Sequence, residues 1–367
     1  MKLIDIIKLI EKDYPLDLCY SWDNSGLLLG DKNFEIKKIM TTLEITKDVV
    51  DEAIENDIDL IISHHPFIFK GLKKVTTDSI KGDLIYKLIK NDISVYSAHT
   101  NFDIAKNGLN DYIMNKLDII NTKIIDKTKV EKLFKLCTYI PKNDFQSVKE
   151  ELLNVNDLKI GNYEKTSFRV DGIGSFMGNE DSSPTIGEKN NLEEVKEFKF
   201  EMMIREESIS KVINQLKKVH PYEEVAYDLI PLANSFDEYT FGLGKVGRLK
   251  EEYELKDFIN KIKDILKIEH VRFVGNDNLK IKKVGVITGS GSEFAYRARN
   301  MGADIFITGD LKYHEAQDAK DAKVNILDVG HFGSEHIFME ILKNYLEEKL
   351  DLDIVKSNTN QNPFKLY

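Results

Sequence analysis

Short apolar runs alternate with charged, amphipathic segments at the start of the chain. The runs at 36–46, 58–63 and 93–100 are rich in β-branched residues, which favours strands. The segments between them, 47–57 and 83–92, place apolar residues at the spacing of a helix face. Because strand–helix–strand order gives parallel pairing with helices on the faces, this third of the chain predicts an α/β layer.

The last third of the chain repeats this plan. Its predicted strands are 281–291, 303–310 and 324–330, and its predicted helices are 292–302, 313–322 and Ser334 to about Leu350. The segments 36–46 and 281–291 both begin with Ile-Lys-Lys. We therefore expect two related α/β halves that face each other and form one unit.

The middle of the chain follows a different order. Strands are predicted at 133–141, 166–176, 193–204 and 224–232, and helices at 143–155 and 208–220. The resulting β-α-β-β-α-β order is that of a ferredoxin-like domain. We predict an α/β protein whose two halves, 1–127 and 241–367, are interrupted by an inserted ferredoxin-like α+β domain at 128–240.

Charge and composition narrow the possible classes of protein. The net charge is −10, and 52 basic residues are interleaved with 62 acidic ones, which disfavours a nucleic-acid surface. No apolar run approaches the ~20 residues that span a bilayer, so no membrane partner is expected. The N-terminal stretch MKLIDIIKLIEKDYP predicts an amphipathic helix instead of a signal peptide, which favours the cytoplasm. Cys19 and Cys137 are only two and far apart, which excludes a disulfide framework or a thiolate metal site.

Six side chains that are able to bind metal follow three of the predicted strands. They are His64, His65, His99, Asp103, His331 and Glu335. The stretch IISHHPFIF places the first two at a strand end, because Pro66 has no N–H and biases His65 away from helix. Strand ends are a common position for chemistry in α/β proteins, and imidazole with carboxylate suits Zn, Fe, Mn, Co or Ni. These strand ends therefore predict a metal site.

The spacing of these residues favours two metal ions over one. Glu335 comes four residues after His331, so both project from one face of a helix that begins there. His64 and His65 are adjacent on extended backbone and are expected to point to opposite sides, each toward its own ion. Asp103, with two oxygens, is the expected bridge. Because two divalent ions ~3.5–4 Å apart activate a shared water for hydrolysis, we expect two divalent ions per chain.

Other motifs are weak or absent. A single histidine can also occupy an ordinary surface or core position without binding metal. We assign His270 and His336 to that class. The zincin pattern H-E-x-x-H does not occur, because Asp318 stands where the second histidine belongs, and no P-loop motif is present. In GSGSEF (289–294), Phe294 replaces a glycine of the dinucleotide fingerprint. A tight turn is favoured there, with an anion at the helix N-terminus as the alternative.

Five motifs, in order along the chain, resemble a known family. They are WDNSGLLLGD (22–31), SHHPFIF (63–69), SAHTNFD (97–103), TGDLKYHEA (308–316) and DVGHFGSE (328–335). Together they resemble the NGG-interacting-factor-three-like dinuclear metal proteins, whose members are often named GTP cyclohydrolase 1 type 2 homologs. The stretch HPYEEVAYD (220–228) is similar to the extra domain of the long bacterial form, which is related to CutA and PII-like folds.

The resemblance implies specific roles for residues of this chain. The implied ligands of the metal pair are His64, His65, Asp103, His331 and Glu335. His99 and His314 match recurrent family positions and would line the site as catalytic or substrate-facing groups. Trp22 would pack in the wall of the pocket. The resemblance also implies a toroidal homohexamer, with the metal sites facing an internal cavity and the inserted domains capping the ring.

Two functions from different classes are consistent with these expectations. The first is a metal-dependent hydrolase of a small phosphorylated or nucleotide-like substrate, with His99 or His314 as general acid–base group. GTP cyclohydrolase activity is what the family name suggests. The second is a metal-binding regulatory or scaffold protein whose inserted domain senses a ligand or a partner. Because a family name is only an association with a reaction, a substrate screen on metal-loaded protein is needed to separate the two.

Overall fold

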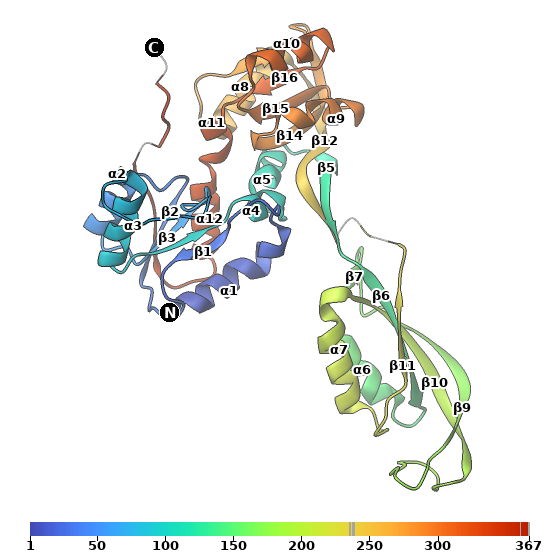
Figure 1. Ribbon diagram of the computed structural model, residues 1–367. Helices are drawn as coiled ribbons and strands as arrows, with labels where there is room; N and C mark the ends of the chain where they lie inside the picture. The colour runs from blue at the N-terminus through green and yellow to red at the C-terminus, as the bar shows by residue number, and fades with distance from the viewer. Residues whose placement is uncertain (235, 237–238, 360, 366–367) are drawn as a thin grey trace. The chain divides into compact units, whose positions relative to one another are not determined.

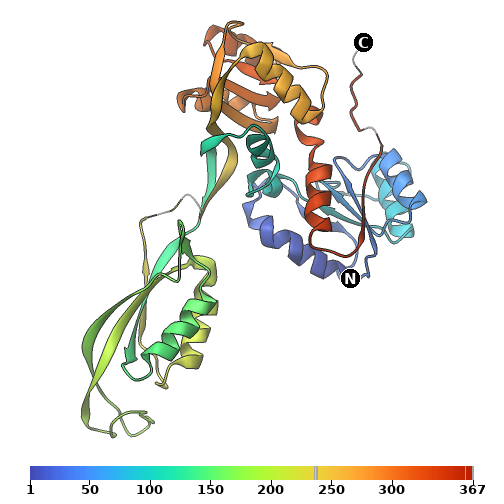
Figure 2. The same cartoon turned by 180° about the vertical axis from the view of Figure 1, so that it is seen from behind.

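The computed structural model describes residues 1–234, 236, 239–359 and 361–365, and Figure 1 and Figure 2 show it from opposite sides. The chain forms two compact units. The larger unit is Met1–Thr128 with Phe241–Tyr367, and the smaller unit is Lys129–Thr240. Within the described residues, no helix combines the length and the apolar character that crossing a bilayer needs.

Two mixed sheets form the frame of the larger unit. The first has the order β1-β4-β3-β2-β17 and the second the order β13-β16-β15-β14-β12-β5. The strands of the first sheet are β1 (Gly26–Leu29), β2 (Lys38–Thr42), β3 (Leu60–Ser63), β4 (Ser94–Ser97) and β17 (Asp353–Lys356). Those of the second are β5 (Ile120–Val130), β12 (Thr240–Glu254), β13 (Arg272–Val274), β14 (Lys280–Ser290), β15 (Ile305–Gly309) and β16 (Ile326–Asp328).

The same strand plan occurs in both sheets. Strands β2, β3 and β4 are parallel, and so are β14, β15 and β16. One antiparallel strand borders the last member of each triplet, β1 next to β4 and β13 next to β16. The carboxyl ends of the strands in each triplet therefore lie at one edge of their sheet, as the alternating sequence pattern predicts.

The helices of the larger unit connect and cover these sheets. They are α1 (Leu3–Asp13), α2 (Lys47–Glu55), α3 (Ile80–Lys90), α4 (Thr100–Ile104), α5 (Leu109–Lys116), α8 (Leu255–Leu266), α9 (Ala295–Asn300), α10 (Tyr313–Asp321), α11 (His331–Glu335) and α12 (Phe338–Glu347). Short 3-10 turns occur at Leu16–Leu18 and Ser292–Phe294. Thr46 caps α2 and Ser79 caps α3, because each hydroxyl accepts a hydrogen bond from a backbone N–H of the first turn.

The long helix expected from Ser334 to about Leu350 differs in the structure. The helical segment begins earlier, at His331, because Gly330 turns the chain out of β16 with a φ of +77°, a conformation that favours glycine. It is also divided into α11 and α12. His336 and Ile337 at the division have ψ values of −21° and −18°, close to those of a 3-10 turn.

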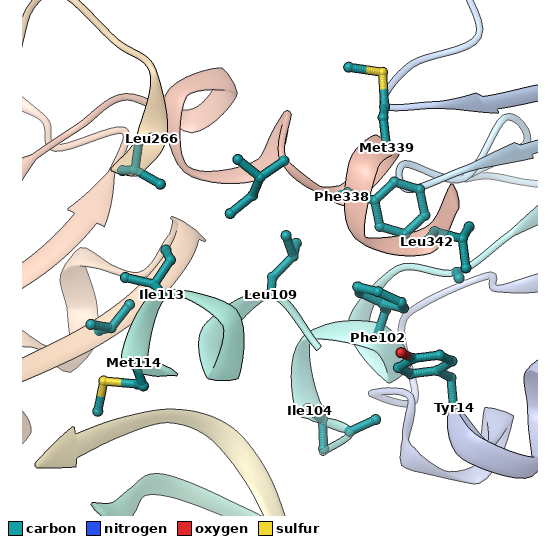
Figure 3. Packing of buried hydrophobic residues seen from close by; sticks show 14 of the residues in the cluster. Tyr14, Phe102, Ile104, Leu109, Ile113, Met114, Leu266, Phe338, Met339 and Leu342 are labelled. Carbon is teal, nitrogen blue, oxygen red and sulfur yellow. The ribbon is translucent and has the colours of Figure 1, made fainter. Parts of the chain in front are cut away.

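One hydrophobic core joins the two sheets of the larger unit. Figure 3 shows part of it, where Phe338 and Leu342 of α12 lie near Phe102 of α4 and Tyr14. The ring centroids of Phe102 and Phe338 are 4.9 Å apart. The last strand, β17, pairs with β2 although the two are at opposite ends of the chain. The segment assigned to the C-terminal half therefore also completes the first sheet.

The smaller unit has its own sheet and its own core. Its strands are β6 (Leu133–Pro141), β9 (Phe168–Met177), β10 (Leu192–Arg205) and β11 (Tyr227–Pro231), and its helices are α6 (Phe145–Val155) and α7 (Ile209–Val219). A short hairpin of β7 (Lys159–Ile160) and β8 (Tyr163–Glu164) and a 3-10 turn at Glu206–Ser208 complete it. The sheet order is β11-β6-β10-β9, with every neighbouring pair antiparallel. Apolar residues of both helices pack with Leu136, Phe200 and Met202.

The chain leaves and re-enters the larger unit through neighbouring strands. These are β5 and β12, which lie side by side at the edge of the second sheet. The sequence pattern does not predict this ribbon, because its residues carry no continuous apolar run. Adjacent exit and entry points are the arrangement that tolerates an inserted segment.

Candidate metal centre

Strand ends of both sheets in the larger unit bring the predicted residues together. His64 and His65 follow β3 directly, and His99 follows β4 and precedes α4, which carries Asp103. His331 begins α11, shortly after β16. Parallel strands end at one edge of a sheet, so side chains that are distant in sequence converge there.

Glu335, at the end of α11, lies at the centre of this cluster. Its Oε2 is 2.8 Å from Nε2 of His65 and 2.9 Å from Nε2 of His331. Its Oε1 is 3.9 Å from Nε2 of His64. Burial would raise the pKa of the carboxyl, but hydrogen bonds with His331 and His65 outweigh it and hold the pKa well below the usual range. Glu335 is therefore an ionised carboxylate that connects the two sheets.

His64 and Asp103 form the buried part of the cluster. The Nε2 of His64 lies 3.7 Å from Oδ1 of Asp103, which is too long for a hydrogen bond. Both atoms are buried without a hydrogen-bond partner among the described residues. Burial, followed by the charge of Glu335, raises the pKa of Asp103 well above its usual value. Buried polar atoms without partners cost free energy, and a cation between these two would satisfy both.

The ring orientation of His64 and His65 is fixed from outside the cluster. The Nδ1 of His64 donates a hydrogen bond to the carbonyl oxygen of Ala98 over 2.8 Å, which leaves Nε2 without a proton and facing Asp103. Burial lowers the pKa of His64 to about 4, so the ring is neutral. The Nδ1 of His65 lies 2.6 Å from Oε1 of Glu44. Such outer partners orient histidine ligands and raise their basicity.

His99 and His331 have the same arrangement. The Nδ1 of His99 lies 2.8 Å from Oδ1 of Asp23, and the Nδ1 of His331 lies 2.7 Å from Oδ2 of Asp310. Each of the four imidazoles thus has an oxygen partner at Nδ1 and can offer Nε2 to a metal ion. This uniform pattern is typical of carboxylate–histidine–metal sites.

Without a metal ion, His65 and His331 in the more exposed part of the cluster are protonated and carry the positive charge. Burial alone would lower the pKa of His65, but hydrogen bonds with Glu335 and Glu44 outweigh it and raise the pKa to about 10. Burial also opposes protonation of His331, and hydrogen bonds with Glu335 and Asp310 raise its pKa to about 9. The cluster therefore attracts positive charge.

Two overlapping groups of ligand atoms could hold metal ions. One is His64, His65 and His99, and the other is His65, His331 and Glu335, with the ligand atoms of each group within 4.8 Å of one another. Nitrogen and carboxylate oxygen without sulfur suit a borderline or hard divalent ion. The structure thus contains His/Glu groups that could bind metal, as the sequence predicts.

The prediction that His64 and His65 point to opposite sides is wrong. Their ring centroids are 5.1 Å apart, and both Nε2 atoms face Glu335. The alternation holds for extended strands, whereas β3 ends at Ser63 and the histidines lie in the bend that follows. Glu335 is the carboxylate that lies within 3.9 Å of three imidazole nitrogens. The bridging role of Asp103 stays a prediction.

Sequence reasoning missed the residues that support the cluster. Glu44 and Asp310 each follow a parallel strand of the triplets, β2 and β15, so the strand-end rule could have found them if applied to every strand. Gly289 lies within the GSGSEF stretch, for which a tight turn was expected. A Cβ at this position would lie 2.1 Å from Oε1 of Glu335, so the glycine makes room for the carboxylate.

Trp22 and His314 are both exposed in the structure. Trp22 does not pack in a wall, since it is 57% exposed. It stacks on Tyr20 with ring centroids 5.5 Å apart, and it meets the rings of His99 and Phe69 at 6.1 Å. These rings form an exposed aromatic platform next to the cluster. His314 is exposed on α10, where its ring contacts that of Tyr313.

The fold and the cluster together define a class of protein: a mixed α/β protein with an imidazole–carboxylate cluster that could bind metal. The chain belongs to the DUF34/NIF3 family, because residues 1–363 match the family described as Duf34/NIF3 (NGG1p interacting factor 3). The family resemblance predicted from the five motifs is confirmed.

Relatives and solved structures match the chain over nearly its whole length. A GTP cyclohydrolase 1 type 2 homolog of Bacillus subtilis is 41% identical over 364 residues, which cover 98% of this chain and 97% of that protein. A protein of the same name from Staphylococcus epidermidis is 39% identical, with both chains fully covered. The crystal structure of a Bacillus cereus protein related to NIF3 has a TM-score of 0.91, with 36% identity and coverage of 100% and 99%. A Staphylococcus aureus structure has a TM-score of 0.79, with 35% identity and the same coverage.

Proposed function

We propose that the cluster holds two divalent metal ions and that the protein is a metal-dependent hydrolase of a small phosphorylated or nucleotide-like substrate. The observation that carries this proposal is the pair of buried, unpartnered atoms, Nε2 of His64 and Oδ1 of Asp103, which lie 3.7 Å apart. Buried polar atoms without partners are uncommon in folded proteins, and a cation between these two would satisfy both. The proposed metal is Zn, Fe, Mn, Co or Ni, which all accept this ligand set.

The proposed ligands are five side chains of the cluster: His64, His65, Asp103, His331 and Glu335. When bound, divalent ions supply a Lewis acid and a water activated for attack. We assign proton transfer to His99, because Asp23 holds its Nδ1 and leaves Nε2 free beside the ligands. His314 would face the substrate from α10, and its exposure predicts a smaller effect when it is replaced.

The aromatic platform supports a substrate with a planar ring. Trp22 is exposed, and its ring lies edge-on to that of His99. Stacking of a heteroaromatic ring on Trp22 would place the rest of a nucleotide-like molecule toward the cluster. GTP, which the names of the relatives suggest, is one member of this class.

Replacing Asp103 with alanine should lower turnover at least 1,000-fold, on the order expected when a metal pair is disrupted. The test is a screen of the metal-loaded protein against p-nitrophenyl phosphate and nucleoside triphosphates, followed by kinetics of the variant on any substrate found. Asp48→Ala is the control, because Asp48 is an exposed carboxylate on α2. Equal activity in the wild type and Asp103→Ala would contradict the proposed site.

The second candidate function is a metal-binding regulatory or scaffold protein. It is favoured by the smaller unit, which has a hydrophobic core of its own and is available as a separate sensing module. Binding of nucleotides without turnover in the same screen would support this function over the hydrolase.

We also propose that residues 128–240 are an inserted ferredoxin-like domain. The β-α-β-β-α-β order and the fully antiparallel sheet support this assignment. Replacing Lys129–Thr240 with a short Gly/Ser linker should leave a soluble protein with wild-type metal content, because the larger unit keeps its own core. An insoluble or metal-free deletion variant would show that the insert is needed for folding.

Self-association into a homohexameric ring is a further part of the proposal. It is supported by two exposed apolar side chains three residues apart on one face of α3, Tyr86 and Ile89, which are 55% and 56% exposed. Such a surface on one helix is typical of a contact with another chain.

The free cysteines Cys19 and Cys137 suit the reducing cytoplasm, which we propose as the compartment.

A further inference from the structure

A cavity of about 400 Å³ lies in the smaller unit, separate from the proposed metal centre. Its lining comes from β9, β10, the loop after β9 and the segment that begins with Tyr222. Phe198 and Phe200 of β10 contact Phe145 of α6, so they face the helices. Glu197 alternates with them along the strand and lines the cavity from the other face of the sheet. A volume of this size suits a small molecule.

The cavity is lined by acidic side chains and by no basic one. Glu197, Glu223 and Glu224 contribute three carboxylates, while the lining contains no Lys, Arg or His. The backbone N–H of Ser183 donates to Oε1 of Glu223 over 2.8 Å, which attaches the loop after β9 to the wall. Because no cation of the lining balances these carboxylates, the cavity favours a positively charged occupant.

Glu197 is the buried carboxylate of this set, with 7% of its surface exposed. Its Oε1 accepts a hydrogen bond from the hydroxyl of Tyr222 over 2.7 Å. Its Oε2 accepts no hydrogen bond from a described residue and is not among the fully buried atoms that lack a partner, so this oxygen is accessible to a ligand in the cavity. Burial disfavours the ionised form of a carboxylate, and a cationic group in the cavity would offset that cost.

Backbone and aromatic residues shape the space around this carboxylate. A Cβ at Gly174 would lie 2.3 Å from Oε2 of Glu197, so the glycine is what admits the carboxylate. The rings of Phe176 and Tyr222 meet edge to face with centroids 5.9 Å apart, and Tyr139 also lines the cavity. Aromatic faces beside a carboxylate stabilise an organic cation by cation–π attraction and cover its apolar body.

We propose that this cavity is a binding site for a small organic cation, a primary amine with an apolar body. The ammonium group would pair with Glu197 and donate to its free Oε2, while the apolar body would lie against Phe176 and Tyr222. The site does not depend on the metal centre and gives the smaller unit a ligand of its own.

Isothermal titration calorimetry of the full chain with benzylamine and putrescine tests this proposal. We expect at least one amine to bind with a Kd below 1 mM at low salt, while benzyl alcohol and benzoate bind at least tenfold more weakly, because they lack the positive charge. Glu197→Gln should weaken amine binding at least tenfold. Glu201→Gln is the matched control, since Glu201 lies on the same strand and pairs with Lys135 and Lys199.

Two further variants keep the test decisive if Glu197→Gln is unstable. Gly174→Ala should displace the carboxylate and weaken binding, and Phe176→Leu should weaken it through loss of the aromatic face. Circular dichroism verifies that each variant is folded. The proposal is overturned if neither amine binds below 1 mM, if the neutral analogue binds as tightly, or if folded variants bind as the wild type does.

Discussion

Replacing Glu335 with glutamine should leave the purified protein with less than a tenth of the wild-type metal content. The carboxylate contacts the Nε2 atoms of His65 and His331 at 2.8 and 2.9 Å, and it lies 3.9 Å from that of His64. Glutamine keeps the shape but removes the charge that would balance a divalent ion. Loss of a supporting partner typically costs 10–100-fold in metal affinity, and loss of a central ligand costs at least as much.

Elemental analysis of the wild type and two variants measures this effect. The wild type should carry two divalent ions per chain. Glu340→Gln is the matched control, because Glu340 is a carboxylate on the next helix that pairs with Lys356 at 3.0 Å. A single ion per wild-type chain, or equal losses in both variants, would refute the dinuclear assignment.

Local sequence patterns predicted that the six side chains at the strand ends would lie close together. Runs of β-branched residues predicted the parallel strands, and Pro66 predicted where one of them ends. Since parallel strands end at one edge, the positions of His64, His99 and His331 relative to the sheets could be inferred without coordinates. The repeated strand–helix pattern also led us to expect two related halves that face each other, whereas the full set of five ligands came from the family resemblance.

Other features depend on contacts that no local pattern contains. β17 pairs with β2 from the opposite end of the chain, and the β5–β12 ribbon has few fully apolar positions. The convergence of His64 and His65 depends on the backbone beyond β3, where strand alternation no longer applies. Asp23 orients the ring of His99, which is 76 residues away in the sequence, and Glu44 orients the ring of His65, which is 21 residues away. Both contacts exist only when the loops are folded.

Removal of the metal should reverse the pH dependence of stability at alkaline pH. In the metal-free protein the pKa values of His65 and His331 are raised to about 10 and about 9. A histidine whose pKa is higher in the folded chain than in the unfolded chain stabilises the fold. This stabilisation is complete below pH ~6.5, the pKa of histidine in the unfolded chain, and it is lost as pH rises through 9 to 10. The loss should be about 2–4 kcal/mol, because partly exposed His331 is screened by solvent. Burial lowers the pKa of His64 to about 4, so its contribution is lost as pH falls from about 6.5 toward 4.

The metal-loaded protein should behave in the opposite way on the alkaline side. Metal ligands must be deprotonated, so protons compete with the ions and stabilisation grows as pH rises from about 5 to 8. A free metal concentration a thousandfold above Kd stabilises the fold by about 4 kcal/mol.

Urea unfolding at pH 6, 7.5 and 9, with and without EDTA treatment followed by dialysis, measures how stability changes with pH in the metal-free and the metal-loaded protein. From pH 7.5 to 9 the midpoint of the metal-free protein should fall while that of the loaded protein stays level or rises. Glu335→Gln supplies the internal check, because it removes the carboxylate that raises the pKa of both His65 and His331. Its metal-free form should therefore show a much smaller alkaline loss than the wild type. Identical slopes with and without metal would mean that protons and metal ions do not share this cluster.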